Sequence, residues 1–312
     1  MTWFAASSTT KGSSAGRGRL LDEALLAALH GLSLPRRRVR GALPGEHAGS
    51  QAGRGEDFFQ HRGYVRGEDL RSIDWRASGR TGTLLVKERH RPLRQPLALL
   101  VDASASMDLP PGASKARCAK KLAAGLALLG LRRGDPVSVF GLSSSANPSP
   151  ISSVFIPRGR AVPGGRATTA AEELIGRIES TARADAAAAL AAFPAGPLLG
   201  AQAVILSDLY GDESAFTAGV GSLVRAGVAV TVLHVLSAEE RALPSRTSAV
   251  RDVETGEERA IAPGEAAAMA ARVEAWESRL RAAAGRAGAE WLSVDPSVHP
   301  AVTLRKWLSD KA

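Results

Sequence analysis

The sequence contains little cysteine and few aromatic residues. Its 312 residues include one cysteine, Cys118, and aromatic residues make up 4% of the chain. A single cysteine cannot form an internal disulfide, and its place in an Ala/Leu-rich stretch predicts a buried small hydrophobe in a reducing compartment. We therefore expect a cytoplasmic protein. So few aromatic side chains also disfavour a stacking platform for nucleic acid.

Long apolar runs are also missing. No stretch approaches the roughly 18 apolar residues that a membrane-spanning helix needs, and the N-terminal residues lack a signal-like apolar region. The arginines at 36–38 are followed by VRGALPG and not by an apolar core, so we expect no twin-arginine export signal. The sequence also lacks a Walker-type phosphate loop, which excludes nucleotide hydrolysis by that route.

The order of the predicted elements indicates an α/β protein. Strands alternate with helices from residue 96 onward, which is typical of a doubly wound, mostly parallel sheet with right-handed crossovers. We expect a disordered tail at 1–18, a helix and a basic segment at 19–95, and the α/β domain at 96–312. Residues 237–288 depart from the alternation and predict an inserted hairpin and helix.

The most informative stretch is LALLVDASASMD, residues 97–108, in which an apolar strand ends in alternating acidic and hydroxyl side chains. Asp102, Ser104 and Ser106 stand at the carboxyl end of a parallel strand, where open α/β sheets bind ligands. Oxygen ligands of this kind suit a hard divalent cation such as Mg²⁺ or Mn²⁺. The alternative is that one of these side chains only caps the next helix, which we expect to begin near Ser114.

Two later loops offer further oxygen ligands. Thr168 and Thr169 follow a glycine pair just before a helical run, and Asp208 follows a β-branched strand. In motif order and strand placement, the three loops resemble the metal-ion-dependent adhesion site (MIDAS) of von Willebrand factor A domains. The resemblance implies metal ligands at Asp102, Ser104, Ser106, Thr168 and Asp208. The sequence leaves open whether Thr168 or Thr169 faces the metal.

The chemistry of such a site is binding. Neutral hydroxyl ligands leave the cation electrophilic, with a coordination position for the carboxylate of a partner. Ser104 stands where a haloacid-dehalogenase-like phosphatase needs its second acid, and neither Ser104 nor Ser106 has the flanking glycines of a nucleophile elbow. We therefore expect a metal-dependent protein-binding module and not an enzyme.

A second motif precedes the strand. Residues 45–92 resemble the signature of the domain-of-unknown-function 58 (DUF58) family, and the resemblance runs from about Arg36 to the C-terminus. The matching core positions are Arg62, Tyr64, Gly67, Glu68, Asp69, Arg71, Ile73, Asp74 and Trp75. The resemblance implies a von Willebrand A-like domain that often accompanies a MoxR-type AAA+ ATPase in the chaperone-like maturation of other proteins. Many family members carry transmembrane helices ahead of this signature, and none is predicted here.

Positive charge is concentrated in the first third of the chain. Residues 1–96 carry 17 Lys and Arg against 9 Asp and Glu, whereas residues 97–312 carry 23 against 22. One hypothesis makes the signature a partner contact, through Arg62, Tyr64, Asp69, Arg71, Asp74 and Trp75. The alternatives are that its arginines pair with acids inside the segment and that its aromatics pack onto the sheet. A different function, binding of nucleic acid or an acidic surface beside a vestigial metal site, would also use this charge.

Overall fold

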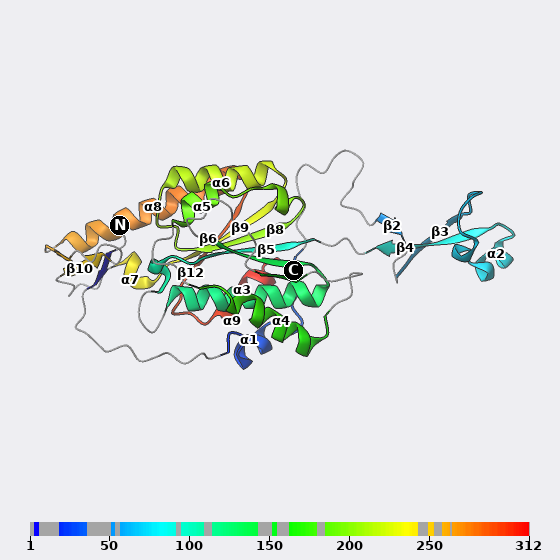
Figure 1. Ribbon diagram of the computed structural model, residues 1–312, viewed down its shortest axis with the longest axis horizontal. Coiled ribbons are helices and arrows are strands. Elements are labelled where there is room, and N and C mark those ends of the chain that lie inside the picture. Colours follow the sequence, from blue (N-terminus) through cyan, green and yellow to red (C-terminus); the bar gives the residue numbers. More distant parts are fainter. Residues whose placement is uncertain are drawn as a thin grey trace. The chain divides into compact units, whose positions relative to one another are not determined.

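The computed structural model describes residues 3–5, 19–35, 51–53, 57–91, 95–108, 114–142, 152–154, 162–179, 185–242, 249–252, 258–262 and 264–311. The chain divides into two compact units. The small unit is residues 42–94, and the large unit is residues 1–41 together with 95–312. Figure 1 labels most of the helices and strands of both units.

The large unit is built on a six-stranded sheet with the strand order β12-β9-β8-β5-β6-β7. Five strands are parallel, and β7 pairs antiparallel with β6 at one edge. This confirms the predicted doubly wound, mostly parallel sheet. The strands are β5 (Leu97–Asp102), β6 (Val137–Leu142), β7 (Ser152–Val154), β8 (Gln202–Ser207), β9 (Ala229–Val235) and β12 (Glu290–Val294).

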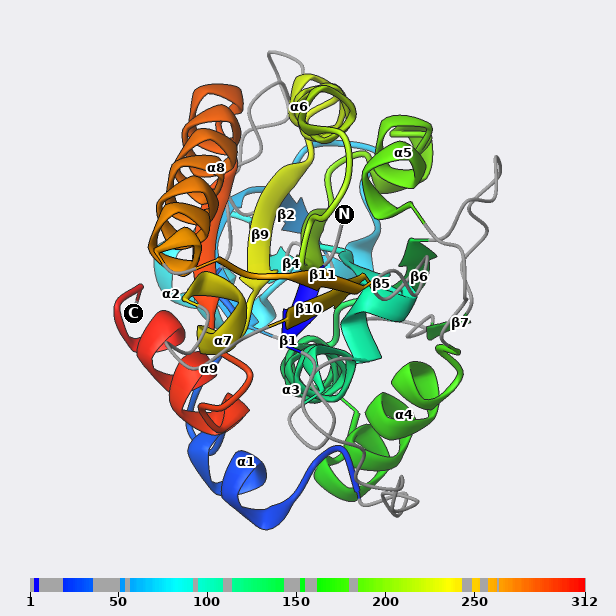
Figure 2. The same cartoon turned by 90° about the vertical axis from the view of Figure 1, so that its left-hand side faces the viewer.

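Helices cover both faces of this sheet (Figure 2). One face carries α1 (Glu23–Ala28), α3 (Lys115–Arg133), α4 (Gly164–Gly176) and α9 (Pro300–Ser309). The other face carries α5 (Ala186–Ala191), α6 (Glu213–Arg225) and α8 (Glu265–Ala287). The single-turn helix α7 (Ala238–Arg241) follows β9. Within the described ranges, every helix is too short or too polar to span a lipid bilayer.

Strand β5 shows why the sheet needs helices on both faces. All six of its residues are buried. Leu97, Leu99 and Val101 join the core that contains the α3 side chains, whereas Ala98 and Leu100 join the core that contains those of α5 and α6. Because side chains alternate across a strand, a continuous apolar run is stable only when both faces are covered.

Two glycines in helices offer a test of the packing on the α6 face. A Cβ atom at Gly219 of α6 would lie 2.7 Å from the Leu190 backbone of α5, whereas one at Gly285 of α8 would meet open space. We expect Gly219→Ala to lower the free energy of unfolding by about 1–3 kcal/mol through overpacking. Gly285→Ala should raise it by up to about 1 kcal/mol, because alanine favours helix. Urea denaturation of both variants measures the difference, and equal effects would contradict the close α5–α6 contact.

The small unit is a three-stranded antiparallel sheet joined to a short helix. Its strand order is β2-β4-β3, with β2 at Gln51–Gly53, β3 at Asp57–Gly63 and β4 at Leu85–Arg91. The connection from β3 to β4 contains the 3-10 turn η1 (Leu70–Ser72) and α2 (Trp75–Thr81).

Three features differ from the divisions expected from the sequence. Helix α1 lies in the large unit and not with the signature segment, because Leu25 and Leu29 are buried in the core shared with α9. Strand β1 (Trp3–Ala5) falls within the stretch expected to be disordered and pairs with β10 (Ala249–Asp252), which also pairs with β11 (Glu258–Ala260). The rest of residues 1–18 lies outside the described residues.

Helix α8 is the third difference, because it belongs to the fold of the sheet. It lies between β9 and β12, which pair in parallel, and parallel neighbours need a crossover connection that is usually a helix. Its buried residues Leu280 and Ala284 join the core on the α6 face. Of the insertion expected at 237–288, the β10–β11 hairpin is the part that pairs outside the main sheet.

Candidate functional site

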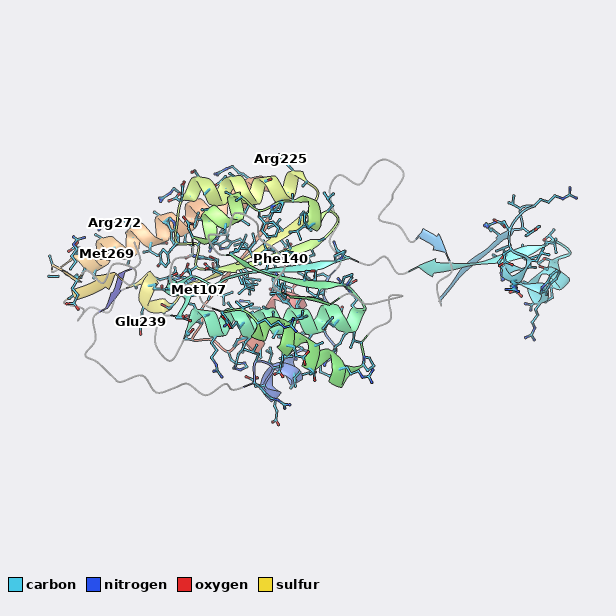
Figure 3. All side chains as sticks on the ribbon, in the orientation of Figure 1. Met107, Phe140, Arg225, Glu239, Met269 and Arg272 are labelled. Carbon is cyan, nitrogen blue, oxygen red and sulfur yellow. The ribbon has the colours of Figure 1, made fainter. Side chains whose placement is uncertain are left out.

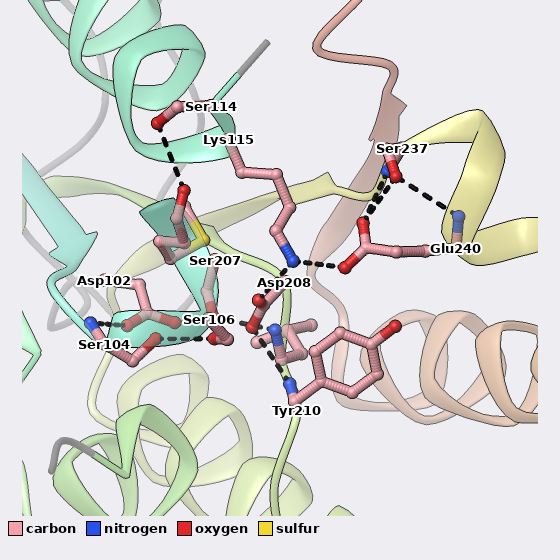
Figure 4. Close-up of polar contacts among 12 residues, drawn as sticks. Asp102, Ser104, Ser106, Ser114, Lys115, Ser207, Asp208, Tyr210, Ser237 and Glu240 are labelled. Carbon is pink, nitrogen blue, oxygen red and sulfur yellow. Dashed lines mark hydrogen bonds and ion pairs between the residues drawn. The ribbon is translucent and has the colours of Figure 1, made fainter. Parts of the chain in front are cut away.

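Four of the five predicted metal ligands lie at the carboxyl ends of two neighbouring parallel strands (Figure 4). Asp102, Ser104, Ser106 and Asp208 are all buried. The Ser104 backbone N–H donates to Asp102 Oδ1 at 2.8 Å, and the hydroxyl oxygens of Ser104 and Ser106 are 2.9 Å apart. The next helix, α3, is capped by Ser114. The alternative in which Asp102, Ser104 or Ser106 caps that helix is therefore wrong.

Ser207, the last residue of β8, completes the environment of Asp102. Its hydroxyl donates to Asp102 Oδ2 at 2.5 Å and accepts a hydrogen bond from the Leu209 backbone N–H at 2.8 Å. Leu209 has a φ of 57°, a left-handed conformation that leucine rarely adopts. Its side chain is buried. Strained backbone of this kind clusters at functional sites, and here it lies directly after Asp208.

Lys115 supplies a fixed positive charge to the same cluster. Its side chain is fully buried, and its Nζ atom lies 2.8 Å from Asp208 Oδ2 and 2.5 Å from Glu240 Oε1. Glu240 is held in turn by Ser237, whose backbone N–H and hydroxyl donate to Oε2 at 2.9 Å and 2.8 Å. Burial would lower the pKa of Lys115, but the neighbouring Asp208 and Glu240 carboxylates outweigh it and raise the pKa above its ordinary value.

The surroundings of Asp102 also shift its pKa. Burial, followed by repulsion from the Asp208 carboxylate, raises the pKa of Asp102 to about 7. Hydrogen bonds from Ser207 and Ser104 oppose the shift without cancelling it. An additional positive charge beside this buried carboxyl group would favour its anionic form and lower its pKa.

The structure corrects the expected position of the threonines. We expected Thr168 and Thr169 in a loop before a helix, but α4 already begins at Gly164, with Pro163 as its N-cap. Their hydroxyl groups donate to the carbonyl oxygens four residues earlier, those of Gly164 and Gly165, at 3.0 Å and 3.2 Å. Among the contacts of the described residues, none joins Thr168 to the other four predicted ligands.

Several signature residues shape the small unit itself. Arg62 donates through Nη1 to Glu68 Oε2 at 3.0 Å and through Nη2 to Oε1 at 2.5 Å, and the Tyr64 hydroxyl donates to the Glu68 carbonyl oxygen. Asp69 caps η1, and Asp74 caps α2. The expected pairing of arginines with acids inside the segment therefore holds for Arg62.

Trp75 and four further arginines of the signature segment, unlike Arg62, are exposed. Trp75 is 64% exposed, so it does not pack in a core of the small unit. The side chains of Arg66, Arg71, Arg76 and Arg80 are also exposed. Within the described part of the chain, no ion pair involves any of these four arginines. Asp69 and Asp74 accept hydrogen bonds from backbone N–H groups at helix starts.

Sequence reasoning missed Lys115, Ser207 and Glu240. A lysine in the first turn of a helix is unfavourable beside the positive end of the helix dipole. The position of Lys115 in the sequence therefore indicates that its charge is balanced by other groups. Ser237 and Glu240 form a capping box with the S-x-x-E spacing that marks a helix start. No comparable signal identified Ser207, because a hydroxyl at the end of a strand is common.

The fold and the site define an α/β protein with a polar cluster at the carboxyl edge of a parallel sheet. A family model described as "Protein of unknown function DUF58" matches residues 60–282, and the chain belongs to this family. This confirms the resemblance of the signature segment. Over 93 residues the chain is 36% identical to uncharacterized proteins of Mycobacterium bovis and Mycobacterium tuberculosis. That match covers 30% of this chain and 29% of theirs.

The chain is also similar to solved structures of low sequence identity. One is the conserved hypothetical protein BatB from Bacteroides thetaiotaomicron, with 17% identity and a TM-score of 0.41 over 70% of this chain and 100% of that chain. Another is a von Willebrand factor type A protein from Catenulispora acidiphila, with 14% identity and a TM-score of 0.41 over 73% of this chain and 44% of that chain.

Proposed function

We propose that the chain is a non-enzymatic protein-binding module whose large unit holds a divalent cation, Mg²⁺ or Mn²⁺, beside Asp102, Ser104 and Ser106. When bound, the cation would present an open coordination position to a carboxylate of the partner. Asp208 would contribute charge from the neighbouring strand, with its orientation set by Lys115. Thr168 is left out of this ligand set because its hydroxyl belongs to the turns of α4.

The charge of the buried cluster is the observation that carries the proposal. Asp102, Asp208 and Glu240 are buried carboxyl groups, and Lys115 is the buried cation that contacts two of them. Fully ionised, this cluster has a net charge of about −2, which is unfavourable in a protein interior. A single divalent cation would neutralise it.

The positions of the hydroxyl groups suit such an ion. Neighbouring ligands of an octahedral Mg²⁺ ion, each at about 2.1 Å, lie about 3 Å apart. The Ser104 and Ser106 hydroxyl oxygens are 2.9 Å apart and follow a carboxylate in the same loop. Among the described residues, no three His, Cys, Asp or Glu side chains gather as a metal-ligand group, so the proposed site depends on these hydroxyls.

Isothermal titration of the metal-free protein with MnCl₂ or MgCl₂ tests the site. We expect one ion per chain for the wild type, and at least a tenfold weaker affinity for Asp102→Ala and for the double variant Ser104→Ala/Ser106→Ala. Asp310→Ala, at an exposed position in the same unit, is the matched control and should bind as the wild type does. Equal binding by all four proteins, or no binding by the wild type, would contradict the proposal.

As the family resemblance implies, we propose a MoxR-type AAA+ ATPase as the partner. An ATPase needs Mg²⁺ to bind its nucleotide. Removal of metal would therefore affect both the ATPase and the proposed metal site, and could not show which of them the complex needs. Purified ATPase with Mg²⁺ and ATP should instead be mixed with wild type or Asp102→Ala and analysed by size-exclusion chromatography. We expect co-elution with the wild type and its loss in the variant. Co-elution of the ATPase with both the wild type and Asp102→Ala would show that the complex does not depend on the metal site.

A further inference from the structure

The connection between β3 and β4, residues 64–84, exposes large apolar side chains. We call this segment the hairpin head. Among the described residues, it holds four of the exposed large hydrophobic side chains, which are 45–64% exposed: Val65, Leu70, Trp75 and Leu84. Several exposed apolar side chains in one short segment of the chain are a candidate interaction surface, whereas single scattered ones need no explanation. Figure 3 shows side chains projecting from the α2 end of the small unit.

The hairpin head has a defined backbone. The Tyr64 backbone N–H donates to the Leu84 carbonyl oxygen at 2.8 Å, and the Asp74 N–H donates to the Leu85 carbonyl oxygen at 2.8 Å. The Ser78 hydroxyl accepts from the Leu85 N–H at 2.9 Å. These bonds tie the start, middle and end of the segment together, so its exposed side chains are presented on an ordered support. Such preorganisation lowers the entropy lost when a partner binds.

Basic side chains accompany the apolar ones. Arg66, Arg71 and Arg76 each directly follow one of the exposed hydrophobic residues in the sequence, and Arg80 lies in the last turn of α2. All four arginines are exposed and none has an ion pair among the residues that the structure describes. Their charge is therefore available to a partner. Tryptophan and arginine are the residue types most enriched at interaction hot spots.

We propose that the hairpin head docks an acidic, amphipathic segment of another protein, with apolar side chains against Trp75 and Leu70 and carboxylates against the arginines. The mixture of aliphatic and indole surface favours a protein over a nucleic acid, which would offer phosphates to the arginines but little to Val65 and Leu84. This surface is separate from the proposed metal site and does not depend on it.

Charge disfavours a second copy of the chain as the occupant of the hairpin head. The small unit holds ten basic and seven acidic residues, a net charge of +3, which leaves +6 for the large unit. Both units are therefore basic. A second copy of the chain therefore lacks the complementary net charge, whereas an acidic partner has it.

The test uses the full chain in EDTA and three fluorescein-labelled probes. The first is a helical peptide with leucines along one face and glutamates beside them. The second has the same composition with the leucines spread around the helix, and the third is a single-stranded oligonucleotide of equal net charge. We expect fluorescence anisotropy to show micromolar binding of the first peptide and at least tenfold weaker binding of the other two.

Variants then place the binding on the hairpin head. Trp75→Ser and the double variant Arg71→Glu/Arg76→Glu should each weaken binding of the first peptide at least tenfold. The controls Val302→Ser and Arg305→Glu change an exposed hydrophobic residue and an exposed arginine of α9 and should have no effect. Circular dichroism confirms that each variant is folded. Unchanged binding by Trp75→Ser, or equal binding of the oligonucleotide, would overturn the proposal.

The same assay separates this proposal from the proposed metal site. Asp102→Ala should bind the first peptide as tightly as the wild type does, because EDTA is present and the two sites lie in different units. Weakened peptide binding by Asp102→Ala would contradict the independence of the hairpin head. Failure of metal binding in the calorimetric test would leave the expected peptide result unchanged.

Discussion

Asp102→Asn is expected to stabilise the metal-free protein at pH 8. The pKa of Asp102 is raised from its ordinary 3.8 to about 7 by burial and by Asp208, so the folded state binds a proton that the unfolded state has already released. The contribution of this group to the free energy of unfolding is greatest below pH 4 and falls as the pH rises to 7. A shift of about three pKa units corresponds to an upper limit of about 4 kcal/mol. An amide removes the ionisation while its oxygen can still accept the Ser104 N–H.

Urea denaturation in EDTA between pH 4 and pH 9 measures the effect. The difference in unfolding free energy between Asp102→Asn and the wild type should grow with pH up to about 7 and then level off. Asp310→Asn, at an exposed position, should show no such trend. Addition of MgCl₂ at pH 8 should stabilise the wild type but not Asp102→Asn. A constant difference across the pH range would contradict the raised pKa.

Lys115→Met is expected to have the largest destabilising effect. It removes the buried ammonium that contacts both Asp208 and Glu240 and leaves two carboxyl groups without their partner. Removing one member of a buried ion pair costs about 3–5 kcal/mol. The double variant Lys115→Met/Glu240→Gln should recover part of this loss, because one of the two unpaired charges is gone. Chemical denaturation at pH 7 measures both variants.

Lys121→Met provides the comparison for this effect. Lys121 Nζ lies 2.6 Å from Asp22 Oδ2, but the Asp22 side chain is 32% exposed, so water can replace the lost partner. Pairs near the surface contribute about 0–1 kcal/mol. A loss for Lys115→Met no larger than the loss for Lys121→Met would show that the buried cluster is not held by the lysine.

Much of the fold could be predicted because the signal is local. The run from Leu97 to Val101 is continuously apolar, and this pattern indicates a strand covered on both faces. The loop from Asp102 to Ser106 was placed correctly at the end of that strand. The threonines were not placed correctly, because a glycine pair usually disfavours helix. Helix α4 nevertheless starts at Gly164, because its apolar face, which includes Ala171 and Ile175, is buried.

The sequence by itself determined the family, the parallel sheet and the edge at which the acidic and hydroxyl side chains collect, because strand periodicity and motif order are properties of neighbouring residues. Only the tertiary structure showed that Lys115 meets Asp208 and Glu240, which are 93 and 125 residues away in the chain. It also showed which signature residues are exposed. Long-range charge pairing depends on how separate elements pack and leaves no periodic trace in the sequence. The exposure of side chains in the turns of the small unit likewise depends on the folded backbone.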